Sequence, residues 1–269
     1  QLPEQTGFSS IIRNFPAQVE NKGWEMVVSA SPFRKGKIHW NTSFNVTLLP
    51  TNKLLEFPGL ESSSYSGLLK IGESVNTIRG YNYLGIDEKT GVYTFEEPFE
   101  FLIRGNIDPK FYGGLSNNLK AGSWNLNFLF EFRKQTGKSY LESVANTQPG
   151  RPVNQPKIVL NRWQKPGDNA SVQQYTSMAY GAIATPAFYL SYSNGVYSDA
   201  SFIRLKNISV SYALPEAWVS TMRIKDLNFF LSCQNLFVIT KFKGADPENQ
   251  DIYMLPPLRN ISAGVNLNF

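Results

Sequence analysis

Three carboxylates stand close together in the segment GADPENQD, residues 244–251, and carboxylates at close spacing can bind a metal ion. They are Asp246, Glu248 and Asp251. Carboxylate oxygens are the ligands that hard cations such as Ca²⁺ prefer. The spacing of these three side chains fits no known ligand pattern. We therefore expect a solvated loop here and no metal site.

The sequence offers no recognisable set of catalytic residues. His39 is the single histidine, and because it stands beside Trp40 at the start of an expected strand we interpret it as a packing residue. No G-x-S-x-G nucleophile motif occurs, and GGLSNN lacks the Gly-Lys-Ser/Thr ending of a phosphate-binding loop. Paired carboxylates for glycoside hydrolysis stay open, since they would lie far apart in the chain. We predict a protein that is not an enzyme and that needs no cofactor.

Aromatic residues are concentrated in two long segments, 50–110 and 134–200. Their rings offer flat apolar faces with a polar group at the edge, which suits the C–H faces of sugars. Asn, Gln and Arg side chains nearby can bind hydroxyl groups or peptide carbonyls. The alternative is that the rings pack the loops together. Trp163 is the first choice for a ligand contact, and the candidate binding residues are Arg162, Trp163, Tyr175, Tyr189, Tyr192, Tyr81 and Tyr83.

Composition indicates an ordered chain without a disulfide framework. Its 269 residues are 42% hydrophobic, a length that suits one large β domain or two smaller ones. Cys233 is the single cysteine, and no apolar run is long enough for a transmembrane helix. The lysines and arginines behind the net charge of +5 are scattered, so we expect no nucleic-acid partner. Gln1 begins no signal peptide, which predicts either a processed chain or an incomplete one.

Period-two alternation recurs along the sequence and predicts strands. In WNLNFLFEF, residues 124–132, every second side chain is a large apolar one, and the others are three polar residues and one leucine. The terminal LRNISAGVNLNF, residues 258–269, alternates in the same way. No convincing 3.6-residue period occurs, so the predicted fold class is all-β. The predicted strands are 24–30, 40–49, 111–119, 124–132, 201–212, 227–238 and 258–269.

The lengths of these strands and of their connections favour a transmembrane barrel. Several strands reach the roughly nine to eleven residues that a tilted bilayer-spanning strand needs, and their second face is rich in Asn and Ser. Short connections alternate with the long segments 50–110, 134–200 and 239–257. Outer-membrane barrels have short periplasmic turns and long extracellular loops in this way. The mean hydropathy of −0.27 does not contradict this, because lipid-facing and lumen-facing residues average out.

Several segments together resemble the C-terminal part of SusC/RagA-type TonB-dependent transporters, which are outer-membrane proteins of the Bacteroidetes. The resemblance begins with ASFIRLKNISVSYALP at 200–215, continues through LNFFLSCQNLFVITKFKGADPE at 227–248 and includes the terminal strand. Four upstream segments follow the family in the same order, so the resemblance covers nearly the whole chain. They are VENKGWEM, IRGYNYLGID, DPKFYGGLSNNL and VLNRWQKPGD.

The resemblance implies a barrel of about 22 strands with a plug domain. It implies a SusD-like surface lipoprotein as a lid, an oligosaccharide or peptide as substrate, and an inner-membrane TonB complex that drives import. It also implies that the terminal strand, through Val265, Leu267 and Phe269, is recognised by the barrel-assembly machinery. In the outer membrane, the remaining partners are lipid and the rest of the barrel and plug.

The chain departs from the family in what it lacks. It contains no plug domain and no TonB box, and its seven strands are too few to close the expected barrel, so we expect the remaining strands to come from elsewhere. An Asp-rich calcium loop seen in many relatives is replaced by GIDEKTGVYTFEEP, residues 85–98. Two alternatives stay open: a secreted soluble β-rich carbohydrate-binding module, and an outer-membrane adhesin or enzyme barrel that does not transport.

Overall fold

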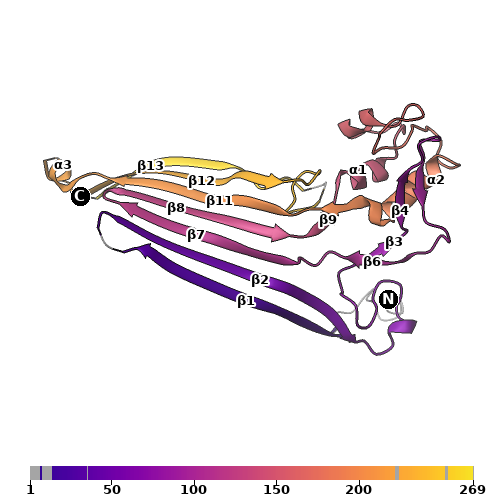
Figure 1. Cartoon of the computed structure of the whole chain (residues 1–269), viewed down its shortest axis with the longest axis horizontal. Helices are drawn as coiled ribbons and strands as arrows, with labels where there is room; N and C mark the ends of the chain where they lie inside the picture. Colours follow the sequence, from indigo (N-terminus) through magenta and orange to yellow (C-terminus); the bar gives the residue numbers. More distant parts are fainter. Residues whose placement is uncertain (1–6, 8–13, 35, 222–223, 252–253, 269) are drawn as a thin grey trace.

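Seven long strands form one antiparallel sheet in the computed structural model, and they lie side by side in the order of the sequence (Figure 1). The structure describes residues 7, 14–34, 36–221, 224–251 and 254–268. The predominance of antiparallel sheet confirms the expected all-β class. The strands are β1 (Gln18–Phe33), β2 (Ile38–Glu56), β7 (Phe111–Ala121), β8 (Trp124–Lys134), β11 (Phe202–Ala213), β12 (Asp226–Thr240) and β13 (Asn260–Asn268).

The strand register gives the sheet one apolar and one polar face. Because side chains alternate across a strand, directly paired residues share a face. One row crosses six strands with apolar residues only: Trp40, Leu119, Leu126, Val210, Leu231 and Ala263. The adjacent row is entirely polar: Asn41, Asn118, Asn127, Ser209, Ser232 and Ser262.

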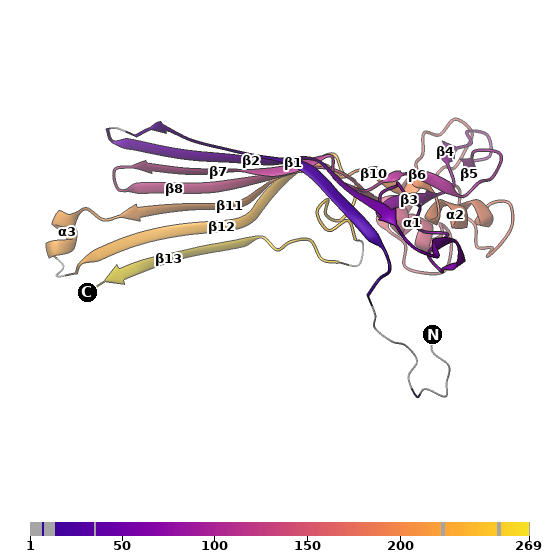
Figure 2. The same ribbon diagram turned by 90° about the horizontal axis from the view of Figure 1, so that it is seen from below.

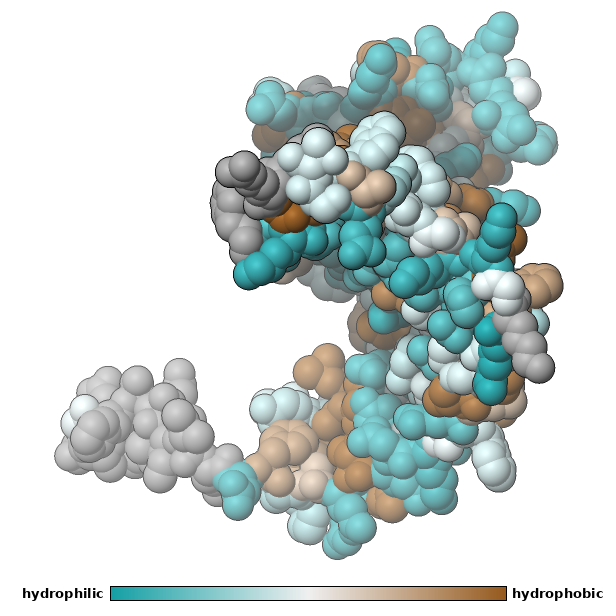
Figure 3. All heavy atoms as spheres, turned by 90° about the vertical axis from the view of Figure 1, so that its left-hand side faces the viewer, coloured by the Kyte–Doolittle hydropathy of each residue, from teal (hydrophilic) through white to brown (hydrophobic). Residues whose placement is uncertain are grey.

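Large side chains on the apolar face are exposed. Trp24 on β1, Ile239 on β12 and Ile261 on β13 are 76%, 61% and 64% exposed. Viewed from the α3 end, the molecule has a curved outline that is open on one side (Figure 3). The sheet is therefore a curved wall whose apolar side is available to another apolar phase.

Short and long connections lie at opposite ends of this wall. The turns between β1 and β2 and between β7 and β8, together with α3 (Glu216–Thr221), lie at one end, and the long connections gather at the other (Figure 2). Two long strands run beyond their predicted bounds of 24–30 and 40–49. The alternation is interrupted there by a bulge between Lys22 and Trp24 and by Leu49, whose φ is 50°.

The long connections are folded, and they contain two short α-helices that no sequence pattern predicted. The α-helices of the connections are α1 (Tyr140–Thr147) and α2 (Ala184–Ser191), each only eight residues long. Two turns of helix are too few to show a 3.6-residue period among loop residues. The other elements are η2 (Leu60–Ser62), β3 (Thr77–Gly80), β4 (Tyr83–Ile86), β5 (Tyr93–Phe95), β6 (Leu102–Asn106), β9 (Thr136–Lys138), η3 (Lys157–Asn161), η4 (Asn194–Val196) and β10 (Tyr197–Asp199).

The buried hydrophobic clusters of the molecule lie mainly in these connections. One cluster joins α1, α2 and β5, and consists of Tyr93, Ala145, Ala187, Leu190 and Val196. Another consists of Val144, Val159 and Val172. The loops therefore have hydrophobic cores of their own, which support the side chains on their surface. Within the described ranges, no helix is both long enough and apolar enough to cross a membrane.

Candidate ligand-binding surface

Six aromatic rings from two separate connections form a continuous surface, the aromatic ridge. The centroid of the Tyr81 ring lies 4.1 Å from Phe99, 5.2 Å from Tyr189 and 5.4 Å from Phe101. Phe188 on α2 continues the ridge, with its ring centroid 6.0 Å from Tyr189 and 5.1 Å from Tyr192. Phe99, Phe101, Phe188 and Tyr192 are between 40% and 49% exposed.

Backbone pairing between residues 80–83 and 192–194 brings the two halves of the ridge together. The Tyr81 amide donates to the Tyr192 carbonyl at 3.0 Å, and the Asn194 amide donates to the Tyr81 carbonyl at 3.1 Å. The Asn194 side chain also accepts from the Tyr83 amide at 2.8 Å. Gly80 permits this approach, because a Cβ at that position would overlap the Tyr192 carbonyl oxygen. Glycine is thus required here for the contact between loops.

Tyr83 lies beneath the ridge and belongs to the loop core. Its ring centroid is 5.7 Å from Tyr93 and 5.9 Å from Phe95. Burial raises the pKa of the Tyr83 phenol to about 12, so the hydroxyl is neutral at physiological pH. Burial likewise raises the pKa of Tyr93. Tyr83 thus supports the ridge from below, while Tyr81, Tyr189 and Tyr192 are part of it.

Arg162, Trp163 and Tyr175 form a different cluster. Trp163 is only 8% exposed, and its Nε1–H donates to the Glu88 carbonyl at 3.3 Å. A Cβ at Gly91 would overlap the Trp163 indole, so the ring packs directly on that backbone. The Arg162 guanidinium lies 3.7 Å from the centroid of the Tyr175 ring, a cation–π contact. In this arrangement Trp163 is a packing residue, whereas Arg162 and Tyr175 form part of the surface.

Comparisons with known proteins show that the chain is similar to TonB-dependent receptors. TonB-dependent receptor P3 of Formosa agariphila is 25% identical over 317 residues, covering the whole chain and 30% of the receptor. TonB-dependent receptor SusC of Bacteroides thetaiotaomicron is 23% identical over 309 residues, covering the whole chain and 28% of the receptor. The homologues of the present chain are thus TonB-dependent receptors. These receptors are not enzymes. No family model matches the chain.

Solved structures of a relative show the same fold. A structure of the RagAB peptide transporter matches the whole chain with a TM-score of 0.75 at 22% identity, and the match covers 31% of that chain. The RagAB peptide importer in an open-open state matches with a TM-score of 0.74. The chain spans about 30% of the length of the curated receptors that it matches. The expected resemblance to the SusC/RagA-type receptors is therefore confirmed for a segment of them.

The 244–251 loop of this receptor homologue is folded onto the wall, and the expectation of a solvated loop is wrong for Asp246. That side chain is 6% exposed and its Oδ2 lies 2.6 Å from Nη2 of the buried Arg204. Glu248 accepts from Lys206 at 2.7 Å, and Lys206 also pairs with Glu131 at 3.0 Å. Among the described residues, no group of three His, Cys, Asp or Glu side chains is arranged to hold a metal.

Phe99, Phe101 and Phe188 are the ridge residues that are absent from the candidate set predicted from the sequence. Phe99 and Phe101 belong to FEEPFEF, residues 95–101, in which three of the seven residues are aromatic and three are acidic. Exposed aromatic residues flanked by charges are an unusual composition for a loop, and this composition was the available signal. Phe269, expected to be part of an assembly signal, lies outside the described residues.

Proposed function

We propose that this chain is a C-terminal part of the barrel wall of a TonB-dependent importer in the outer membrane. The observation that carries the proposal is the uninterrupted apolar row opposite a polar row across the sheet. An exposed apolar face of this extent suits contact with a lipid phase. Sequence similarity to TonB-dependent receptors over the full chain supports the same assignment.

Completion of the barrel requires strands beyond those seen here. Within the described sheet, β1 pairs with β2 alone and β13 with β12 alone. Unpaired strand edges cannot lie in hydrocarbon, because their backbone groups would have no hydrogen-bond partners. We therefore propose a closed barrel of about 22 strands with a plug, of which this chain supplies seven strands.

The aromatic ridge is the proposed capture surface for an oligosaccharide or peptide. Tyr192 supplies an exposed ring at the loop end, the half-buried Tyr81 and Tyr189 continue the ridge beside it, and Arg162 with Tyr175 supplies a second contact. A SusD-like lipoprotein would close over these loops, and the RagAB relative, which is a peptide importer, supports this assembly. Energy would come from a TonB complex acting through parts of the protein outside this chain.

The terminal strand is the proposed recognition element for the barrel-assembly machinery. Val265 and Leu267 lie on the apolar face, where they pair with Phe229 and Leu227 of β12. An exposed apolar strand at the edge of the sheet suits recognition by pairing with another strand.

The native mass of the detergent-extracted particle that contains this chain tests the proposal. We expect a membrane-bound particle several times larger than the chain, which contains the remaining barrel strands and a lipoprotein. A discrete species of the chain's own mass that is soluble without detergent would contradict the proposal and favour a secreted carbohydrate-binding module. A membrane particle without a plug would instead favour a barrel that does not transport.

A further inference from the structure

A polar pocket lies at the loop end of the wall, where β1 and β2 depart from regular pairing. The register shifts between Lys22 and Trp24, where the single residue Gly23 of β1 lies opposite two residues of β2, Leu49 with its positive φ and Pro50. A cavity of about 550 Å³ lies beside this register shift, between β1, β2 and the start of β7. This volume falls in the range of small-ligand sites, roughly 300–1,000 Å³.

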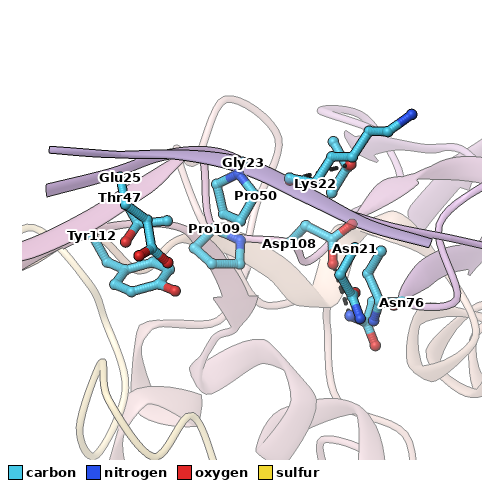
Figure 4. A pocket seen from close by; sticks show the side chains of 12 residues that line it. Asn21, Lys22, Gly23, Glu25, Thr47, Pro50, Asn76, Asp108, Pro109 and Tyr112 are labelled. Atoms are coloured by element: carbon cyan, nitrogen blue, oxygen red, sulfur yellow. Dashed lines mark hydrogen bonds between the residues drawn. The ribbon is translucent and has the colours of Figure 1, made fainter. Parts of the chain in front are cut away.

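The strand register places this pocket on the polar face of the wall. Glu25 pairs with Thr47, and Thr47 pairs with Tyr112, so these three side chains form one row on that face. Figure 4 shows Tyr112, Glu25 and Thr47 at one end of the pocket and Asn21, Asn76 and Asp108 at the other. Pro50 and Pro109 lie between the two groups. In a barrel, this face borders the lumen.

The lining combines an aromatic face with many groups that both donate and accept hydrogen bonds. Tyr112 is 36% exposed, and the Arg133 guanidinium lies 5.6 Å from its ring centroid. The Asn76 amide donates to Asp108 at 2.7 Å, which fixes one carboxylate oxygen at the far end. The hydroxyl groups of a sugar bind to such a mixture of donors and acceptors. The C–H groups of the sugar ring pack on a flat apolar face.

The charges of the pocket argue against an anionic ligand. Its lining contains the two carboxylates of Glu25 and Asp108 and one cation, Lys22, while the Arg133 guanidinium beside Tyr112 already lies 3.6 Å from Glu131. The Lys22 ammonium already pairs with Glu20 at 2.6 Å. An acidic sugar or a phosphorylated ligand would meet an excess of negative charge, whereas a neutral ligand would not.

We propose that this pocket is a subsite for a neutral saccharide unit, with Tyr112 as the stacking platform and Glu25 and Asp108 as hydroxyl acceptors. The inference rests on the proposed function in that it takes the imported substrate to be the ligand. The pocket is separate from the aromatic ridge, because no residue of the ridge lines it. A substrate released from the loops would meet it at the entrance to the lumen.

The test uses the intact detergent-extracted receptor on an array of neutral hexasaccharides, with a library of uncharged decapeptides as the other arm. Three variants are compared with the unaltered protein: Tyr112→Ala, the isosteric Glu25→Gln, and Tyr180→Ala as a matched control. Tyr180 is 84% exposed and does not line the pocket. Glu25→Gln keeps the test informative if Tyr112→Ala folds poorly, which circular dichroism of each variant reports.

We expect at least one neutral saccharide to bind, with an affinity that falls about tenfold in Tyr112→Ala and measurably in Glu25→Gln. Tyr180→Ala should bind like the unaltered protein. Absence of saccharide binding, saccharide binding that neither pocket variant changes, or Tyr112-dependent binding of peptides instead would each overturn the proposal. If one of these three contradicting results is obtained with a receptor shown to be a membrane particle, the pocket assignment fails and the importer assignment stands. Tyr112-dependent saccharide binding by a soluble species would contradict the importer instead.

Discussion

Arg204 is a charged side chain buried in the wall. Carboxylates of the 244–251 loop lie beside it and stabilise its charge. Its side chain is 4% exposed, that of Asp246 is 6% exposed, and Glu248 lies 3.2 Å from the guanidinium. A buried charge that loses its partner is costly, about 3–5 kcal/mol in typical cases. The loop and the wall should therefore separate as one cooperative event.

We predict that Asp246→Asn lowers stability by about 3 kcal/mol, because it leaves the Arg204 charge without its closest partner. Hydrogen exchange of residues 244–248 and thermal unfolding of the purified protein measure the effect. Glu20→Gln is the control, since the Glu20–Lys22 pair is exposed and contributes little. Similar stability in the two variants would show that the buried pair does not hold the loop.

Asp199 holds a second junction between loop and wall, and its charge makes that junction sensitive to acid. The carboxylate pairs with Lys134 at 2.6 Å and accepts from the Ser201 amide at 2.9 Å. The Lys134 hydrogen bond is the main cause that lowers the pKa of Asp199 from 3.8 to about 2. Since the folded-state pKa is the lower one, the stabilisation is present above pH 3.8 and is lost as the pH falls toward 2.

We expect cleavage by pepsin around residues 197–201 to increase as the pH falls through this window. Asp199→Asn should already be cleaved near pH 3.8, the upper end of this pH window, because its neutral amide cannot pair with Lys134 as a carboxylate does. Mass spectrometry of the fragments gives the site and rate of cleavage. Equal cleavage of the two proteins at the upper end would exclude the ion pair as the cause.

At the scale of the strands, adjacent glycines of β7 have different roles. A Cβ on Gly113 would overlap the Asn45 carbonyl oxygen and lie 2.7 Å from the Phe132 ring, which stacks on Phe44 with centroids 5.6 Å apart. A Cβ on Gly114 would meet its nearest atom, the Phe130 carbonyl oxygen, at 3.3 Å. Gly113 therefore lets an aromatic ring lie flat over the strand.

We predict that Gly113→Ala destabilises the sheet by about 1–3 kcal/mol, whereas Gly114→Ala is tolerated with a small local shift. The heat-modifiable mobility of the folded barrel in gel electrophoresis and its unfolding in urea measure the difference. Equal losses in the two variants would show that the stacked ring can move aside.

The strands were predictable from the sequence because alternation of side chains is a local signal. The candidate site could not be assembled from the sequence, because it depends on which residues meet in space. Alternation along WNLNFLFEF shows one face of β8 without any knowledge of its neighbours. In contrast, Tyr81 and Tyr189 meet only because backbone pairing joins residues more than a hundred positions apart. Trp163 was a reasonable choice by residue type, but its burial against Gly91 is a tertiary contact.

At the scale of the whole molecule, the two faces of the sheet should contact different solvents. Val210 and Ser209 are neighbours on β11, paired with Leu126 and Asn127 of β8 respectively, so they lie on opposite faces at one depth. In a membrane barrel, the first side chain contacts acyl chains and the second contacts the aqueous lumen. In a soluble module, the apolar face would instead be covered by protein.

We therefore predict that a fluorescent label on Val210→Cys and the same label on Ser209→Cys are quenched by different quenchers. Both variants also carry Cys233→Ser, so that the label attaches at one position. In liposomes, a nitroxide on the lipid acyl chain should quench the label at position 210 strongly and the label at position 209 weakly. A water-soluble quencher should give the reverse order, because the lumen is wet and the acyl region excludes ions. A label at position 210 that neither quencher reaches would mean that protein covers the apolar face, and the wall would then be half of a soluble sandwich.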